Sequence, residues 1–126
     1  MTGIQYLLDE HVDPDLRTGL LQNWPGIAVW CIGDPGAPER GTLDPEILSW
    51  CEDHGYILVT NNRSTMPVHL ASHLAAGRHI PGIFILRTRL RMGDTIRDLG
   101  VVWAAGDPRD YADIVSYMPI SFQQTL

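Results

Sequence analysis

Short polar segments follow four apolar runs of this 126-residue sequence, and they hold the side chains that could do chemistry. These segments are Asp9-Glu10-His11, Gly33-Asp34, Thr60-Asn61-Asn62-Arg63-Ser64 and Arg87-Thr88-Arg89. Hard divalent cations prefer oxygen ligands, and arginine binds phosphate through a planar fork of donors. Acidic side chains beside an arginine rim could therefore hold a divalent cation against a phosphate. Loops are polar in general, so an ordinary set of strand-end loops is the alternative.

The elements that must position these segments alternate along the chain. Apolar runs at 4–8, 27–32, 56–60 and 82–86 are typical of strands, and 114–118 is expected to form an edge strand. Helices are expected between them, capped by Asp13, Asp44 and Asp94, with a further helix over 67–76. This alternation predicts one α/β domain over residues 1–126, with three α/β/α layers and a mostly parallel sheet. Ligands of such sheets bind beyond the carboxyl ends of the strands, where the strand order switches.

Composition sets limits on the function. Hydrophobic residues make up 44% and charged residues 19% of the chain, which is typical of a globular domain and excludes a disordered one. There is no run of 18 apolar residues and no pattern typical of a signal peptide, so we expect a cytoplasmic protein without a membrane segment. The net charge of −6 opposes nucleic acid binding overall, although all nine basic residues are arginine. Cys31 and Cys51 are expected to be buried, reduced thiols.

Three blocks of the sequence carry a family resemblance. They are Leu7-Leu8-Asp9-Glu10-His11-Val12, Leu43-Asp44-Pro45-Glu46-Ile47-Leu48 and Ile57-Leu58-Val59-Thr60-Asn61-Asn62-Arg63. In order and spacing they resemble the signature blocks of the DUF5615 PIN-like family, over about residues 4–86. That family is related to PIN-domain ribonucleases and to the toxins of toxin–antitoxin pairs. The resemblance implies a PIN-like fold, an RNA substrate cut with Mg²⁺ or Mn²⁺, an antitoxin protein as partner and a homodimer.

The resemblance also implies site residues. Asp9 matches the first acid of the family's metal site and Glu46 matches the second. The third block of the family reads Val-Thr-x-Asp-x-Asp, whereas Asn62 and Ser64 stand here at the two aspartate positions. An asparagine oxygen can still bind Mg²⁺, but each lost carboxylate removes a negative charge. The resemblance therefore predicts Asp9, Glu46 and Asn62 as catalytic and metal-binding residues. The arginine rim at the strand ends independently predicts that Arg63, Arg87 and Arg89 contact the substrate.

Each of these residues also has a structural interpretation. Asp9 could form a strand-end turn, Asn62 an Asx-turn, and Glu46 a favourable contact with a helix dipole. Capping alone explains Asp44, and Glu10 should point away from Asp9 if strand geometry continues.

The histidines raise a separate question. His69 and His73 have the i, i+4 spacing that can share a zinc ion, although a half-exposed polar flank is the simpler interpretation. His54 is expected on the buried face of its helix.

Two functions follow from the sequence. The first is a metal-dependent endoribonuclease, the toxin of a two-protein module. The second is a catalytically degenerate PIN-like domain that binds a protein or RNA without cutting. Cleavage of RNA that depends on Mg²⁺ or Mn²⁺ distinguishes them.

Overall fold

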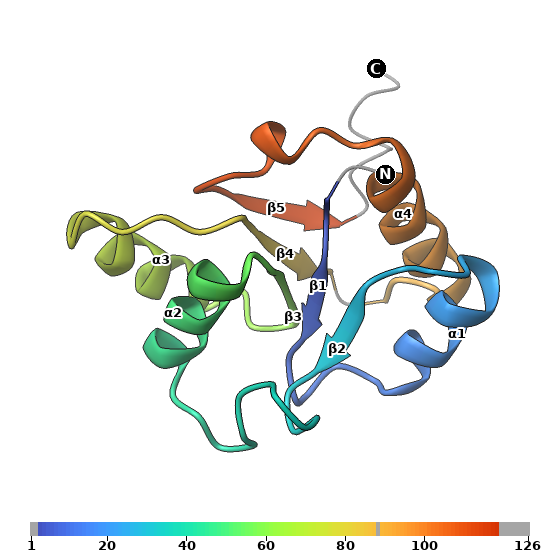
Figure 1. The fold of residues 1–126 in the computed structure, drawn as a ribbon, viewed down its shortest axis with the longest axis horizontal. Helices are drawn as coiled ribbons and strands as arrows, with labels where there is room; N and C mark the ends of the chain where they lie inside the picture. The colour runs from blue at the N-terminus through green and yellow to red at the C-terminus, as the bar shows by residue number, and fades with distance from the viewer. Residues whose placement is uncertain (1–2, 88, 119–126) are drawn as a thin grey trace.

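The computed structural model describes residues 3–87 and 89–118 of the chain, which form a five-stranded sheet between two helical layers (Figure 1). The strand order is β2-β1-β3-β4-β5, and every neighbouring pair is parallel. The strands are β1 (Tyr6–Leu8), β2 (Val29–Cys31), β3 (Ile57–Thr60), β4 (Ile83–Leu86) and β5 (Val115–Met118). The predicted α/β class and its parallel sheet are confirmed, and β5 is an edge strand as expected.

Apart from Thr60 at the end of β3, the side chains of the central strands are mainly apolar, because helices cover both faces of the sheet. Leu7 of β1 lies beside Leu58 of β3, and both belong to the core under one helical layer. Tyr6 and Leu8, which flank Leu7, belong to the core under the other layer. This alternation follows from the period of two along a strand.

Two pairs of helices form the layers (Figure 1). The pair α1 (Asp15–Asn23) and α4 (Met92–Ala105) covers one face, and α2 (Asp44–His54) and α3 (Met66–Ala75) cover the other. Close packing in the first pair depends on glycine: a Cβ on Gly100 would overlap the ring of Trp24. A short 3₁₀ helix, η1 (Pro108–Asp110), follows Asp107, as the Asp-Pro sequence predicts. No helix within the described ranges is long and apolar enough to cross a membrane.

The helix starts differ from the sequence expectation. α1 begins at Asp15 with Pro14 at the N-cap position, so the predicted N-cap position of Asp13 is wrong. Asp44 is the first residue of α2, with Leu43 at the N-cap position, so the predicted capping role of Asp44 is wrong. Asp94 is the third residue of α4, whose N-cap position is Arg91, and that prediction is also wrong. Pro45 has no N–H, which removes one of the donors that a cap would satisfy. The Asp44 side chain is consequently free for another contact.

Candidate functional site

Two polar segments leave the sheet side by side. β1 and β3 are neighbours in the sheet although β2 lies between them in the chain, so the strand order switches at this point. Asp9-Glu10-His11 follows β1 and Thr60-Asn61-Asn62 follows β3. Together with Asp44 at the start of α2 they line a pocket of about 380 Å³, which we call the acidic pocket. Ligands of open parallel sheets bind at such a switch point, so the predicted location of the site is consistent with the fold.

Asp9 is fixed by hydrogen bonds at the end of β1. Its backbone N–H donates to the carbonyl of Val59 at 2.9 Å, which continues the parallel pairing by one residue. The Thr60 hydroxyl donates to Asp9 Oδ2 at 2.8 Å, and the Glu10 backbone N–H donates to Asp9 Oδ1 at 2.9 Å. Both carboxylate oxygens therefore accept a hydrogen bond from the chain itself, which is the strand-end turn expected as the structural interpretation.

Glu10 lies in the same pocket as Asp9, so the expectation that it faces the other way is wrong. β1 ends at Leu8, and the chain turns before Glu10, so strand alternation does not extend to this residue. The Gly41 backbone N–H donates to Glu10 Oε1 at 3.0 Å. Glu10 thereby connects the long loop before α2 to the acidic pocket.

Asn62 forms the Asx-turn expected as its structural interpretation. Its side-chain oxygen accepts from the backbone N–H groups of Ser64 at 3.2 Å and Thr65 at 3.0 Å. Because two N–H groups donate to this atom, it must be the amide oxygen and the other terminal atom must be the nitrogen. The amide nitrogen must then point the other way, where it donates to Thr65 Oγ1 at 2.6 Å and to Asp44 Oδ2 at 3.4 Å.

Asp44, rather than Glu46, is the helix α2 carboxylate at this pocket. Glu46 is exposed and is not among the described residues that line the pocket. Both lie in the first turn of α2, but residues two apart on a helix point about 200° apart, so only one can face the sheet edge. The sequence did contain a signal for Asp44. A helix that follows a parallel strand begins at the carboxyl edge of the sheet, so the first residue of α2 lies near the strand ends.

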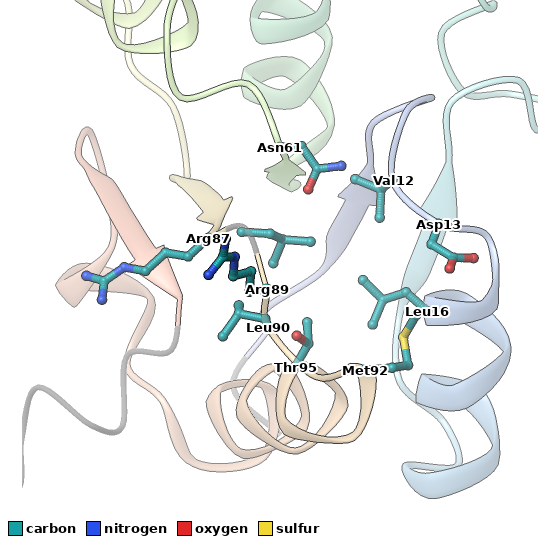
Figure 2. Close-up of a pocket in the computed structure, with 10 residues that line it drawn as sticks. Val12, Asp13, Leu16, Asn61, Arg87, Arg89, Leu90, Met92 and Thr95 are labelled. Atoms are coloured by element: carbon teal, nitrogen blue, oxygen red, sulfur yellow. The ribbon is translucent and has the colours of Figure 1, made fainter.

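The arginines expected to contact a substrate lie around a second pocket of about 630 Å³, which we call the arginine pocket (Figure 2). Arg87 and Arg89 line it, and Asn61 lines both this pocket and the acidic one. Arg63 is exposed and lies outside the described lining of both pockets. The guanidinium of Arg87 lies 5.9 Å from the ring centroid of Tyr117 on β5.

Among the described residues, four of the nine arginines form salt bridges, and Arg40 and Arg91 are unpaired as the three predicted substrate arginines are. Arg17, Arg78, Arg97 and Arg109 each form a salt bridge with an aspartate or glutamate. Within residues 3–87 and 89–118, Arg63, Arg87 and Arg89 form none. Their charges are thus available to an anionic partner, whereas Asp9, Glu10 and Asp44 already accept hydrogen bonds from the protein.

His69 and His73 contact different carboxylates. His69 Nε2 lies 3.6 Å from Asp44 Oδ2, while His73 Nε2 contacts Glu52 Oε1 at 3.0 Å and the His79 carbonyl at 2.9 Å. His73 is buried, so its predicted half-exposed position is wrong, because this carboxylate and carbonyl satisfy it inside the protein. His54 is exposed and stacks on Trp50 with ring centroids 4.2 Å apart, so its predicted burial is also wrong.

The two thiols differ in their surroundings. Cys51 is a buried residue of α2. This burial, with a smaller contribution from the charge of Asp9, raises the pKa of its thiol. Cys31 is only partly buried, so its predicted burial is wrong, although partial burial still raises the pKa of its thiol. Both are free cysteines, as expected.

No protein-family model, curated protein or solved structure matches the chain. Membership of the PIN-like family stays a prediction that rests on the three sequence blocks.

The donor set at the acidic pocket does not fit a ready-made divalent metal centre. Among the described residues, no three His, Cys, Asp or Glu side chains converge as metal ligands would. Both oxygens of Asp9 accept hydrogen bonds, and the oxygen of Asn62 faces its own turn. Glu46, the remaining predicted ligand, lies elsewhere on the helix surface. Mg²⁺ or Mn²⁺ at Asp9, Glu46 and Asn62 therefore stays a prediction that this arrangement of side chains does not favour.

Proposed function

We propose that this protein is a catalytically degenerate PIN-like domain that binds single-stranded RNA at the carboxyl edge of its sheet without cutting it. One observation carries the proposal: the Asn62 amide nitrogen donates to the Asp44 carboxylate in the acidic pocket. A metal site would place a cation at this carboxylate. Here the neutral amide of Asn62 donates a hydrogen bond to the carboxylate instead.

The chemistry of an aspartate at position 62 explains why this contact matters. Its turn oxygen would still accept the two backbone N–H groups, but its other oxygen would face Asp44 Oδ2 where the amide nitrogen now lies 3.4 Å away. Two carboxylate oxygens at this distance repel each other unless a proton or a cation lies between them. Asparagine removes the repulsion and, with it, the electrostatic need for a metal.

The charges at the edge support an anionic strand as the ligand. Arg63, Arg87 and Arg89 are exposed and lack a carboxylate partner within the described chain. Most binding energy for a nucleic acid backbone comes from contacts between such cations and phosphates. Single strands suit the site better than duplexes, since unstacked bases can enter pockets. The net charge of −6 repels RNA at long range, so binding must depend on these local arginine contacts, which salt weakens.

A second candidate is the metal-dependent endoribonuclease that the family resemblance implies. It is favoured by Asp9 and Asp44, two carboxylates that line the same pocket of about 380 Å³. The antitoxin partner and the homodimer implied by the resemblance stay predictions.

The test measures binding and cleavage of one fluorescently labelled, mixed-sequence RNA strand. We expect binding by fluorescence anisotropy in EDTA, weaker after the joint change Arg87→Gln and Arg89→Gln. Arg109→Gln is the matched control, because it removes an exposed arginine that lies at the opposite edge, beside Gln5 and Ile57. We expect no cleavage by the wild type with Mn²⁺. Failure to bind RNA would contradict the proposal, and Mn²⁺-dependent cleavage that Asp9→Asn abolishes would establish the nuclease instead.

A further inference from the structure

The arginine pocket is an open depression whose lining combines apolar, acidic and basic side chains. It lies between the start of α1, the loop from β4 to α4 and the end of β3 (Figure 2). Its floor is apolar, formed by Val12, Leu16, Leu90 and Met92. At about 630 Å³ it falls within the usual size range of small-molecule pockets. An apolar floor of this kind suits a flat ring.

One part of its wall presents hydrogen-bond acceptors, whereas Arg87 and Arg89 supply donors elsewhere on the lining. The Asn61 amide nitrogen donates to the His11 carbonyl at 3.1 Å, and this bond turns the amide oxygen toward the pocket (Figure 2). Thr95, only 5% exposed, uses its hydroxyl hydrogen on the Arg91 carbonyl at 3.3 Å, which leaves its lone pairs for a ligand. The Asp13 carboxylate at the rim adds a third acceptor. A ligand group in contact with these atoms must donate hydrogen bonds.

The two ends of the pocket differ in charge. Asp13 and Asn61 lie at the end formed by the segments after β1 and β3 (Figure 2). Arg89 lies at the other end near Leu90, and Arg87 extends from there toward β5 (Figure 2). Arg89 adopts a left-handed backbone conformation with φ of 71°, which is uncommon for this residue type and bends the loop at the pocket. The ligand is therefore expected to be anionic at one end and rich in N–H donors at the other.

We propose that the arginine pocket binds one nucleotide whose base carries an exocyclic amino group, as adenine and cytosine do. The base lies on the apolar floor, its amino group donates to Asn61 Oδ1, and Arg89 contacts its phosphate. Uracil is disfavoured because it carries a carbonyl where cytosine carries the amino group, and that carbonyl would face an acceptor. This inference rests on the proposed function in one respect, namely that the nucleotide belongs to a bound RNA strand.

Calorimetric titration of the full chain in EDTA tests the inference with three mononucleotides. Adenosine and cytidine 5′-monophosphates are expected to bind at least tenfold more tightly than uridine 5′-monophosphate, since the Asn61 oxygen accepts a hydrogen bond from an amino group and repels a carbonyl oxygen. Cytidine and uridine monophosphates are a size-matched pair, so their difference isolates the amino group. Asn61→Ala should reduce this discrimination to less than threefold. Asn61 is exposed, so this change does not disturb the core.

A second pair of variants tests the location. Met92→Trp should fill the pocket and abolish nucleotide binding, whereas Val101→Trp adds the same bulk to an exposed position of the same helix and should leave binding unchanged. Circular dichroism spectra of both variants are the control for correct folding.

The outcomes separate the two proposals. RNA binding without any mononucleotide binding overturns the pocket assignment and leaves the proposed function standing. Mononucleotide binding without RNA binding overturns the proposed function and leaves the pocket assignment standing. Equal affinity for the cytidine and uridine nucleotides overturns recognition of the amino group.

Discussion

The amide nitrogen of Asn62 lies 3.4 Å from Oδ2 of Asp44, and this contact joins the loop after β3 to the start of α2. His69 of α3 approaches the same carboxylate oxygen, with 3.6 Å between Nε2 and Oδ2. The Asn62 amide thus donates a hydrogen bond to a carboxylate that a metal site would place against a cation. Substitution of Asn62 therefore tests how the charge of Asp44 is stabilised.

Replacing Asn62 by aspartate should remove that stabilisation. In EDTA at neutral pH, Asn62→Asp should lower the free energy of unfolding by about 1–3 kcal/mol, because two carboxylates then face each other and a hydrogen bond is lost. Mn²⁺ should restore this stability and bind at least tenfold more tightly than to the wild type. Urea unfolding with and without Mn²⁺ measures both effects.

Ser64→Asp is the matched control for that experiment. Ser64 is exposed, gives its backbone N–H to Asn62, and is not among the described residues that line the acidic pocket. The same added charge, two residues away, should change neither the stability in EDTA nor the affinity for Mn²⁺ appreciably. An equal response of the two variants would mean that general charge, and not the Asn62–Asp44 contact, is responsible.

The hydrogen bond between Thr60 and Asp9 should be a measurable part of the stability. Thr60 is fully buried, and its hydroxyl donates to Asp9 Oδ2 at 2.8 Å. Asp9→Ala should cost about 1–3 kcal/mol, because it leaves a buried hydroxyl without its acceptor. A double-mutant cycle with Thr60→Val should give a coupling energy of about 0.5–2 kcal/mol. Additive effects of the two changes would show that the bond contributes nothing.

Local sequence patterns were enough to predict the helices and strands, but the position of the site depends on which strands pair across the sheet. Apolar runs separated by amphipathic segments indicate a parallel sheet between helices, which is the fold observed. The strand order depends on which runs pair, and this brought the segments after β1 and β3 together. Asp9 and Asn62 were correctly expected at the carboxyl edge, since both directly follow strands.

Glu10 and Asp44 were misplaced for one physical reason, which is that a shift of one or two positions changes the direction of a side chain. Glu10 was assigned to the wrong face because β1 ends at Leu8 instead of continuing. Asp44 was interpreted as a cap because α2 was expected to begin one residue later. His73 was expected to be half exposed, and its burial depends on Glu52, a partner from another helix that no local pattern reveals.

Asp113 should make stability depend on pH. The backbone N–H of Ile80 donates to its Oδ1 at 2.8 Å and His79 Nδ1 lies 2.9 Å from its Oδ2, and these contacts lower the pKa of the Asp113 carboxyl below its usual range. A lowered pKa in the folded state contributes stability above the unfolded-state pKa of about 3.9, and this contribution is lost as the pH falls through the folded-state value. Asp113→Asn should therefore be less stable than the wild type at neutral pH and nearly equal to it at strongly acidic pH.

Asparagine is the suitable substitute at this position because Asp113 has a φ of 64°, which asparagine tolerates well. Urea unfolding across the acidic range measures the difference, with Asp110→Asn at an exposed position of η1 as the control. A stability difference for Asp113→Asn that is independent of pH would point to packing and not to the charge.

The arginines of the carboxyl edge should determine how RNA binding responds to salt. Each phosphate contact on a single strand contributes about 0.7 to the slope of the logarithm of the binding constant against the logarithm of the salt concentration. If Arg87 and Arg89 each contact one phosphate, their joint replacement by glutamine should lower the magnitude of that slope by about 1.4. Arg109→Gln should leave it unchanged, because this arginine lies at the opposite edge and is paired with Asp107 at 2.7 Å. Fluorescence anisotropy at four or more salt concentrations gives the slopes. An unchanged slope in the double variant, despite weaker binding, would mean that these two side chains shape the pocket instead of contacting the phosphates.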